Sequence, residues 1–286
     1  MKRIGLFVLA LAACDSGGSA NPDAPTGRDS TLPDGPLSMG CGTADPITGV
    51  TTETIMVAGV ARSYLRVVPA SYDPMRPYPL IFAWHGRTGT AAGARSYFGV
   101  TAAVADNAIV VYPQGLAVTA EPSDTGWDLT AAGRDVALYD AIHTAVTSTY
   151  CVGSTFSMGH SFGGYMTNAL ACYRGGATGI RAIASIAGGG PGPSCPGDPV
   201  SALVIHGMGD SVVPFSEGTG SRDRYRTDAA CGTMTQPITP SPCVAFDGCS
   251  AALAVRFCAH TETAGSGHGW PAFAAGASWQ LFQDSL

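Results

Sequence analysis

The chain has 286 residues, of which 45% are hydrophobic and 13% are charged, and its formal net charge at pH 7 is −6. This length is sufficient for one large domain with a substantial core. The acidic balance and the lack of any basic run in the sequence argue against a nucleic-acid-binding protein.

The N-terminus has the pattern of an export signal. Lys2 and Arg3 precede an apolar run at residues 4–13, which is too short to span a bilayer. The run ends directly before Cys14 in the manner of a bacterial lipobox, so residues 1–13 are expected to be a signal peptide and Cys14 a lipidated first residue. Cleavage nearby, with an unmodified cysteine, is the alternative.

The next segment, residues 14–40, is rich in Gly, Ser, Pro, Asp and Thr and has hardly an apolar side chain. Such a composition predicts a flexible tether without packed structure. We therefore expect an exported lipoprotein, held on the cell envelope or released outside, whose only membrane contact is the lipid anchor. The remaining residues, 41–286, are the expected folded domain.

Within this domain strand-like and helix-like segments alternate, which predicts a mostly parallel sheet covered by helices on both faces. Residues 78–84 form an apolar run typical of a buried strand, and a glycine-containing loop follows at 85–90. Residues 134–149 carry apolar side chains at helical spacing with aspartates on the opposite face. This pattern predicts an amphipathic helix that covers the sheet.

Residues 159–163 read Gly-His-Ser-Phe-Gly and lie between a strand-like run and a helix-like run. Strand, tight turn and helix together are the context of a nucleophile elbow. The glycines allow the strand and the helix to approach closely, and the helix N-terminus favours negative charge. Ser161 is therefore the predicted nucleophile, with an ordinary glycine-rich turn as the alternative. His160, the variable residue of the motif, is expected to point away from the serine oxygen.

Two later segments supply an acid and a base in the chain order Ser, Asp, His that this elbow uses. Asp210 follows an apolar strand at 202–206, and His268 lies in a flexible loop after the last strand-like run at 253–258. Asp210 is thus expected to orient His268, and His268 to take the proton of Ser161.

Other residues compete for these roles. His260 is the second candidate for the base, although it lies close to the end of the last strand. Asp247 and Glu262 are weaker candidates for the acid, because neither directly follows a core strand.

An acyl-transfer site also needs donors for the oxyanion. The N–H of Phe162, directly after the nucleophile, is one expected donor. The second should come from the loop at 85–90, where Arg87 is the first candidate and Thr88 the next.

These segments together resemble the α/β-hydrolase fold and, more narrowly, the secreted esterases of the feruloyl esterase and polyhydroxybutyrate depolymerase type, carbohydrate esterase family 1. The resemblance covers residues 41–286 and rests on residues 61–69 with Tyr72 and Asp73, Trp84-His85-Gly86, residues 159–164, His206-Gly207 with Asp210 and Val213-Pro214, and residues 267–271. It implies hydrolysis of a carboxylic ester through an acyl-enzyme, with no cofactor and no metal.

Access to the site can also be predicted. Only fourteen residues, rich in Gly and Pro, separate the strand-like run at 182–187 from the strand at 202, which leaves no room for a large cap domain. An open site suits a bulky or polymeric ester. Trp127 and Trp270 are candidate walls for an aromatic or sugar ring, with burial in the core as the alternative for each.

Apart from Cys14 the chain has eight cysteines, and an even number in an exported protein predicts four disulfides. From their positions we expect Cys41 to pair with Cys151 and Cys172 with Cys195. Four late cysteines should pair among themselves: Cys231, Cys243, Cys249 and Cys258. Zinc binding is the weaker alternative, because no C-x-x-C pair occurs.

The sequence thus predicts a lipid-anchored, monomeric serine hydrolase, and the resemblance implies an esterase that acts on feruloyl, acetyl or hydroxybutyrate esters. A serine peptidase or thioesterase on the same fold is an alternative. A non-catalytic binding lipoprotein is another.

Overall fold

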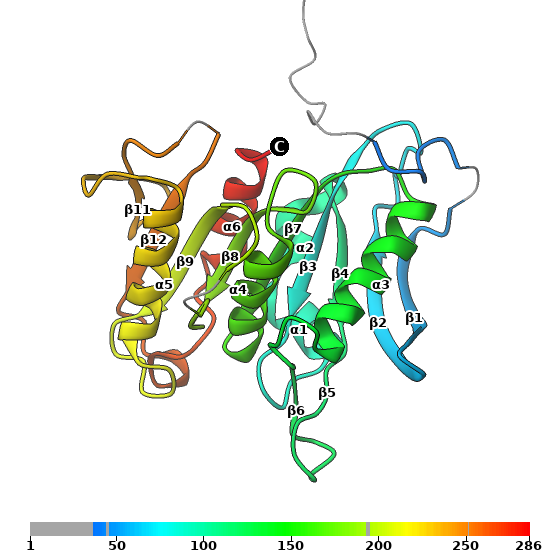
Figure 1. Ribbon diagram of the computed structural model, residues 1–286, viewed down its shortest axis with the longest axis horizontal. Helices are drawn as coiled ribbons and strands as arrows, with labels where there is room; N and C mark the ends of the chain where they lie inside the picture. The colour runs from blue at the N-terminus through cyan, green and yellow to red at the C-terminus, as the bar shows by residue number, and fades with distance from the viewer. Residues whose placement is uncertain (1–36, 44–45, 193–194, 251) are drawn as a thin grey trace, which may run out of the picture. The chain divides into compact units, whose positions relative to one another are not determined.

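The computed structural model describes residues 37–43, 46–192, 195–250 and 252–286, so the expected signal peptide, Cys14 and most of the expected tether lie outside the described residues. The described end of the expected tether is packed, contrary to the expectation: Ser38 Oγ donates to the carbonyl of Tyr150 at 2.7 Å, and the N–H of Gly40 donates to the carbonyl of Thr147 at 2.9 Å. A ten-stranded sheet runs through the described chain in the order β1-β2-β4-β3-β7-β8-β9-β12-β11-β10 (Figure 1). Its centre is a parallel block formed by β4 (Ile109–Pro113), β3 (Tyr78–Trp84), β7 (Val152–His160), β8 (Ile180–Ile186), β9 (Ser201–Gly207) and β12 (Val255–His260).

Antiparallel strands complete both edges of the sheet. On one side β2 (Val60–Val68) pairs with β4 and β1 (Gly49–Val57) pairs with β2; on the other β11 (Cys243–Phe246) and β10 (Thr235–Pro237) follow β12. Every residue of β3, β4 and β9 is buried, whereas burial in β1 alternates along the strand. Continuous burial is expected for parallel strands covered on both faces, and alternation for an edge strand with one face in solvent.

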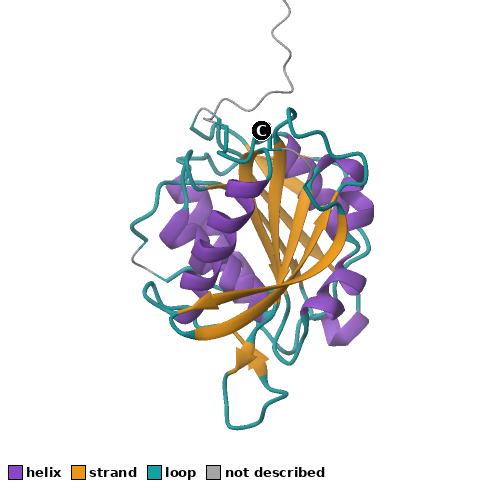
Figure 2. Cartoon of the chain, turned by 90° about the vertical axis from the view of Figure 1, so that its right-hand side faces the viewer, coloured by secondary structure: helices purple, strands orange, loops and turns teal. Residues whose placement is uncertain are grey.

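Helices cover both faces of the sheet (Figure 2). Two separate apolar clusters, one on each face, show which helices share a face. One contains side chains of α3 (Arg134–Thr149), α4 (Phe162–Arg174) and α5 (Phe215–Asp228). The other contains side chains of α1 (Ala91–Phe98), α2 (Val100–Val104) and α6 (Ala274–Gln283). The predicted α/β fold with a doubly wound, mostly parallel sheet is confirmed.

Two short segments matter for the site. The strands β5 (Leu116–Ala117) and β6 (Thr125–Gly126) form a hairpin outside the main sheet, and the single turn η2 (Ala264–Gly267) precedes His268. The link between β8 and β9 contains no helix in its described part, in agreement with the expected lack of a large cap.

The structure joins the cysteines of the domain in four disulfides: Cys41–Cys151, Cys172–Cys195, Cys231–Cys249 and Cys243–Cys258. The first two are the pairs expected from position, and the late cysteines pair among themselves. Disulfides persist in oxidising compartments, which supports an exported protein. None of the helices in the described segments has the length and apolar character needed to cross a bilayer.

Candidate active site

Ser161 stands alone between β7, which ends at His160, and α4, which begins at Phe162. Its backbone angles are φ 55° and ψ −121°, a conformation that is costly for a residue with a side chain. Side chains at the flanking glycines would collide with backbone, at Gly159 with the carbonyl of Gly163 and at Gly163 with the carbonyl of Trp84. The two glycines therefore permit the tight turn that presents Ser161 at the start of a helix.

The structure brings Ser161, His268 and Asp210 into one hydrogen-bonded chain. His268 Nε2 lies 2.8 Å from Ser161 Oγ, and His268 Nδ1 lies 2.7 Å from Asp210 Oδ2. The three residues follow β7, η2 and β9, which are far apart in sequence. They meet because the carboxyl ends of parallel strands share one edge of the sheet.

The competing candidates lie elsewhere. His260 ends β12, is 4% exposed, and neither of its ring nitrogens has a hydrogen-bond partner in the described structure. Asp247 accepts a hydrogen bond from Gln236 at 3.1 Å. Glu262 lies in the exposed loop after β12.

Both oxygens of the Asp210 carboxylate accept hydrogen bonds, and the side chain is fully buried. Oδ1 accepts hydrogen bonds from the N–H groups of Val212 (2.8 Å) and Val213 (2.9 Å). Burial raises the pKa of Asp210, but the hydrogen bonds from His268, Val213 and Val212 outweigh it, so this pKa lies below its usual range. Asp210 is thus a fixed anion against His268.

A second histidine supports this carboxylate from behind. His206 is fully buried, and its Nε2 lies 3.0 Å from the carbonyl oxygen of Val213 and 3.4 Å from Asp210 Oδ2. A carbonyl can only accept, so Nε2 carries the proton. His206 therefore fixes the turn that holds Asp210. The sequence predicts His206 at the end of the strand before Asp210, but it does not indicate this supporting contact.

The motif predicts only that the side chain of His160 points away from the serine oxygen. The structure gives this side chain a contact with the loop of the base. Its Nε2 donates a hydrogen bond to the backbone carbonyl of His268 at 2.7 Å, and the two imidazole rings lie 5.0 Å apart. Burial lowers the pKa of His160 to about 4, which keeps the ring neutral near pH 7. His160 thus positions the loop that carries His268.

The loop after β3 passes directly over the nucleophile. A Cβ atom at Gly86 would lie 3.3 Å from Ser161 Cβ. Thr88 is the wrong candidate for the oxyanion hole, because its N–H is already donated to the carbonyl of Thr125 at 2.8 Å. Neither Arg87 nor Phe162 donates its backbone N–H to any residue in the described part of the chain. These two groups stay as the candidates.

The β5–β6 hairpin holds this loop in place by polar contacts. The guanidinium of Arg87 forms a bidentate ion pair with Asp124, with N–O distances of 2.6 and 2.7 Å. The hydroxyl of Thr125 donates to the carbonyl of Gly89 at 2.6 Å. The hydrogen bond from Arg87 holds the pKa of Asp124 at about 2, so this carboxylate is charged at any working pH. The strained residue Thr88, with φ 62°, is thus held from both sides.

The two tryptophans have different environments. Trp127 is 2% exposed, and its indole N–H donates to the carbonyl of His85 at 2.8 Å, so it supports the loop from the core and cannot form the expected wall. Trp270 is partly exposed and stacks on Phe98 with ring centroids 4.2 Å apart. Its backbone N–H donates to the hydroxyl of Tyr97, an exposed ring that the sequence did not single out.

Comparison with individual known proteins shows which family the chain belongs to. No protein-family model matches the chain. Over 237 residues the chain is 33% identical to the probable feruloyl esterase C of Aspergillus terreus. The aligned region covers 77% of this chain and 83% of the relative. It is 34% identical over 231 residues to feruloyl esterase C of Emericella nidulans, covering 76% and 80%.

Solved structures show the same fold. An acetyl xylan esterase from Aspergillus awamori superimposes with a TM-score of 0.61 at 16% identity, over 82% of this chain and 99% of that one. A ferulic acid esterase from Anaeromyces mucronatus gives a TM-score of 0.52 at 17% identity, over 86% and 94%. With the sequence relatives, these findings establish that the chain has the α/β-hydrolase fold, belongs to the feruloyl esterase family and is a carboxylic ester hydrolase.

Proposed function

We propose that the chain is a serine esterase that cleaves its substrate through an acyl-enzyme on Ser161. The observation that carries this proposal is the unbroken chain of hydrogen bonds from Ser161 Oγ through His268 to Asp210, at 2.8 and 2.7 Å. Hydrogen-bonded nucleophile, base and orienting carboxylate are the elements that activate a serine hydroxyl.

In this mechanism His268 Nε2 takes the proton of Ser161 as the oxygen attacks the ester carbonyl. Asp210 holds the imidazole in the tautomer that leaves Nε2 free to accept, and it stabilises the cation that forms. The N–H groups of Phe162 and Arg87 receive the oxyanion. His268 then gives its proton to the departing alcohol, and water repeats the sequence to release the acid.

The proposed substrates are esters of plant polysaccharides, with a feruloyl group as the first candidate and an acetyl group as the second. The relatives are named as feruloyl esterases, and a neighbour in fold is named as an acetyl xylan esterase. Hydroxybutyrate polyesters have no comparable support from these comparisons.

A panel of methyl ferulate, acetylated xylan, a hydroxybutyrate oligomer, a peptide and a thioester tests this assignment. We expect the highest kcat/KM on the feruloyl ester. Turnover of only a peptide or thioester would favour the peptidase or thioesterase alternative. A folded protein that cleaves none of these would favour a binding lipoprotein.

For location, we propose export with a lipid on Cys14. The support is the apolar run before Cys14 and the polar segment after it. A protein that lacks residues 1–36, keeps the packed Ser38 and is exported with an ordinary signal peptide should be soluble and fully active. Loss of activity in a folded truncated protein would contradict the proposal that this segment is only a tether.

A further inference from the structure

A cavity of about 540 Å³ lies against the two loops that carry the acid and the base. It is lined by residues on both sides of Asp210 and by residues just before His268: Met208, Gly209, Ser211, Thr261, Glu262, Thr263, Ser266 and Gly267. Two backbone hydrogen bonds join these loops, from Met208 to His260 at 2.8 Å and from Ser211 to Ser266 at 3.2 Å. The volume lies within the usual range of ligand sites, about 300 to 1,000 Å³.

The lining combines hydroxyl groups with one carboxylate and one apolar surface. Serine and threonine hydroxyls both donate and accept, and a carboxylate accepts. Met208 is 57% exposed and adds a flexible apolar side chain. Glu262 forms no ion pair or hydrogen bond within the described residues. These features match a ligand that carries several hydroxyl groups on an apolar ring.

The charge of the lining disfavours anionic ligands. None of the lining residues is Lys, Arg or His, and Glu262 places in the lining one of the negative charges of a chain whose net charge is −6. An anionic ligand such as a phosphate, a uronic acid or nucleic acid would be repelled. A neutral carbohydrate would not.

The position of the cavity indicates which part of a substrate it would hold. The nucleophile follows β7, whereas the cavity follows β9 and β12, two and three strands away. With neighbouring strands about 4.8 Å apart, this separation is about 10 to 14 Å across the sheet. That is too far for the ester carbonyl and suits sugar residues remote from the esterified one.

We propose that this cavity is a subsite for the neutral carbohydrate chain that bears the ester. The proposal rests on the proposed function, because it assigns the alcohol side of that same substrate. It explains how an esterase without a large cap would select a polymeric ester over a small one.

Two esters with the same acyl group test the subsite: methyl ferulate and a feruloylated arabinoxylan oligosaccharide. The readout is the ratio of kcat/KM for the oligosaccharide to that for the methyl ester. We expect Glu262→Ala, which removes the carboxylate, to lower this ratio by about tenfold, the effect of one lost hydrogen bond to a charged group. Thr263→Trp fills the cavity and should lower the ratio at least as much.

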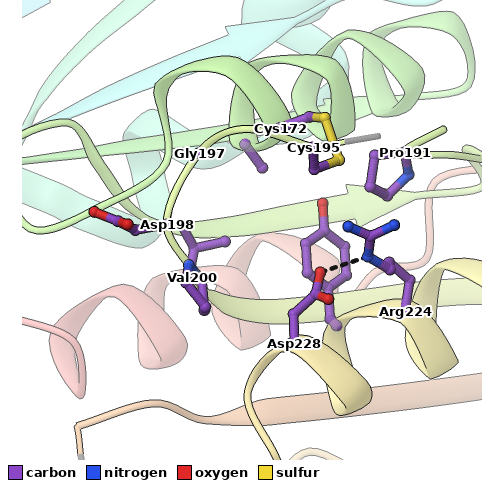
Figure 3. A pocket seen from close by; sticks show the side chains of 11 residues that line it. Cys172, Pro191, Cys195, Gly197, Asp198, Val200, Arg224 and Asp228 are labelled. Carbon is purple, nitrogen blue, oxygen red and sulfur yellow. Dashed lines mark hydrogen bonds and ion pairs between the residues drawn. A yellow bond between two sulfur atoms is a disulfide. The ribbon is translucent and has the colours of Figure 1, made fainter. Parts of the chain in front are cut away.

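A matched control is Asp198→Ala. Asp198 is an exposed carboxylate at a different cavity of about 150 Å³, which Cys172, Cys195 and the Arg224–Asp228 ion pair also line (Figure 3). That cavity lies at the C-terminal end of α4, about 15 Å along the helix from Ser161. The control should leave the ratio at the wild-type value.

An unchanged ratio in both cavity variants would overturn the proposal, and so would equal losses on the two esters, which would mean that the loops only support the triad. Calorimetric titration of Ser161→Ala with unesterified arabinoxylan oligosaccharide separates the subsite from the proposed reaction. Binding there, weakened by Thr263→Trp and absent for an oligogalacturonate, would uphold the subsite even if the acyl group were different. No binding of the neutral oligosaccharide would contradict it.

Discussion

The two halves of the candidate site are built in different ways. On the acid–base half the Asp210 side chain is fully buried, accepts two backbone hydrogen bonds and faces both His268 and His206. On the oxyanion half the loop at Arg87 is fixed by an ion pair at the surface, in which the Arg87 side chain is 59% exposed and that of Asp124 is 14% exposed.

The two halves therefore differ in how many contacts hold their catalytic groups in place. The acid is held by several buried groups, so the loss of one support leaves others in place. The oxyanion loop includes a strained residue, Thr88, and relies on a small hairpin outside the main sheet. A substitution of a surface residue should therefore lower kcat when it affects the oxyanion loop, and it should leave kcat unchanged elsewhere.

The largest expected effect is at the point where the two halves meet. Ser161→Ala removes the nucleophile and should lower kcat by about 10⁴-fold or more on any ester. The free energy of unfolding should hardly change, because one hydroxyl contributes little to packing. Steady-state kinetics and urea unfolding check both. Wild-type turnover in this variant would make the assignment of the nucleophile wrong.

Next comes the buried half. Asp210→Asn keeps the shape of the side chain but removes the charge that stabilises the His268 cation, so kcat should fall by about 10³- to 10⁴-fold with a smaller change in KM. The matched control is Asp247→Asn, since Asp247 bonds to Gln236 outside the triad. If the two variants were equally active, Asp210 would not be the acid.

The oxyanion half predicts a smaller loss from a surface change. Asp124→Asn breaks the ion pair with Arg87 and should lower kcat by about tenfold with little effect on KM, because one oxyanion donor is then less well placed. Asp223→Asn, at the exposed pair with Arg222 on α5, is the control and should keep wild-type kcat. Equal behaviour of the two variants would remove the distinction between the halves.

A last effect, on stability and not on rate, concerns pH. The pKa of His160 falls from its usual 6.5 to about 4 on folding, so between these values the unfolded chain binds more protons than the folded one. The free energy of unfolding should therefore decrease as pH falls from 6.5 to 4. His160→Gln keeps an N–H donor but cannot titrate, so urea unfolding at several pH values should show a shallower slope. An unchanged slope would mean that His160 is not the group involved.

The sequence predicted the elements whose local pattern is decisive. The strand at 78–84 and the helix at 134–149 have the predicted bounds, and the structure brings together the three triad residues. The elbow was predictable because its glycine spacing is a steric requirement of the turn.

Contacts between distant segments were not predictable. His160 meets a carbonyl 108 positions away, and Arg87 pairs with a carboxylate 37 positions away on a hairpin that has no strong strand pattern. Burial of Trp127 and occupation of the Thr88 N–H likewise depend on where the β5–β6 hairpin folds back. Local sequence carries no signal for such partners.

The central claim is that Ser161 is the activated nucleophile. The most direct measurement is mass spectrometry of the folded protein after reaction with a fluorophosphonate ester probe. We predict one adduct per chain, located on the peptide that contains Ser161, with loss of esterase activity in step with labelling and no adduct in Ser161→Ala. Labelling at another residue, or full activity after complete labelling, would contradict the claim.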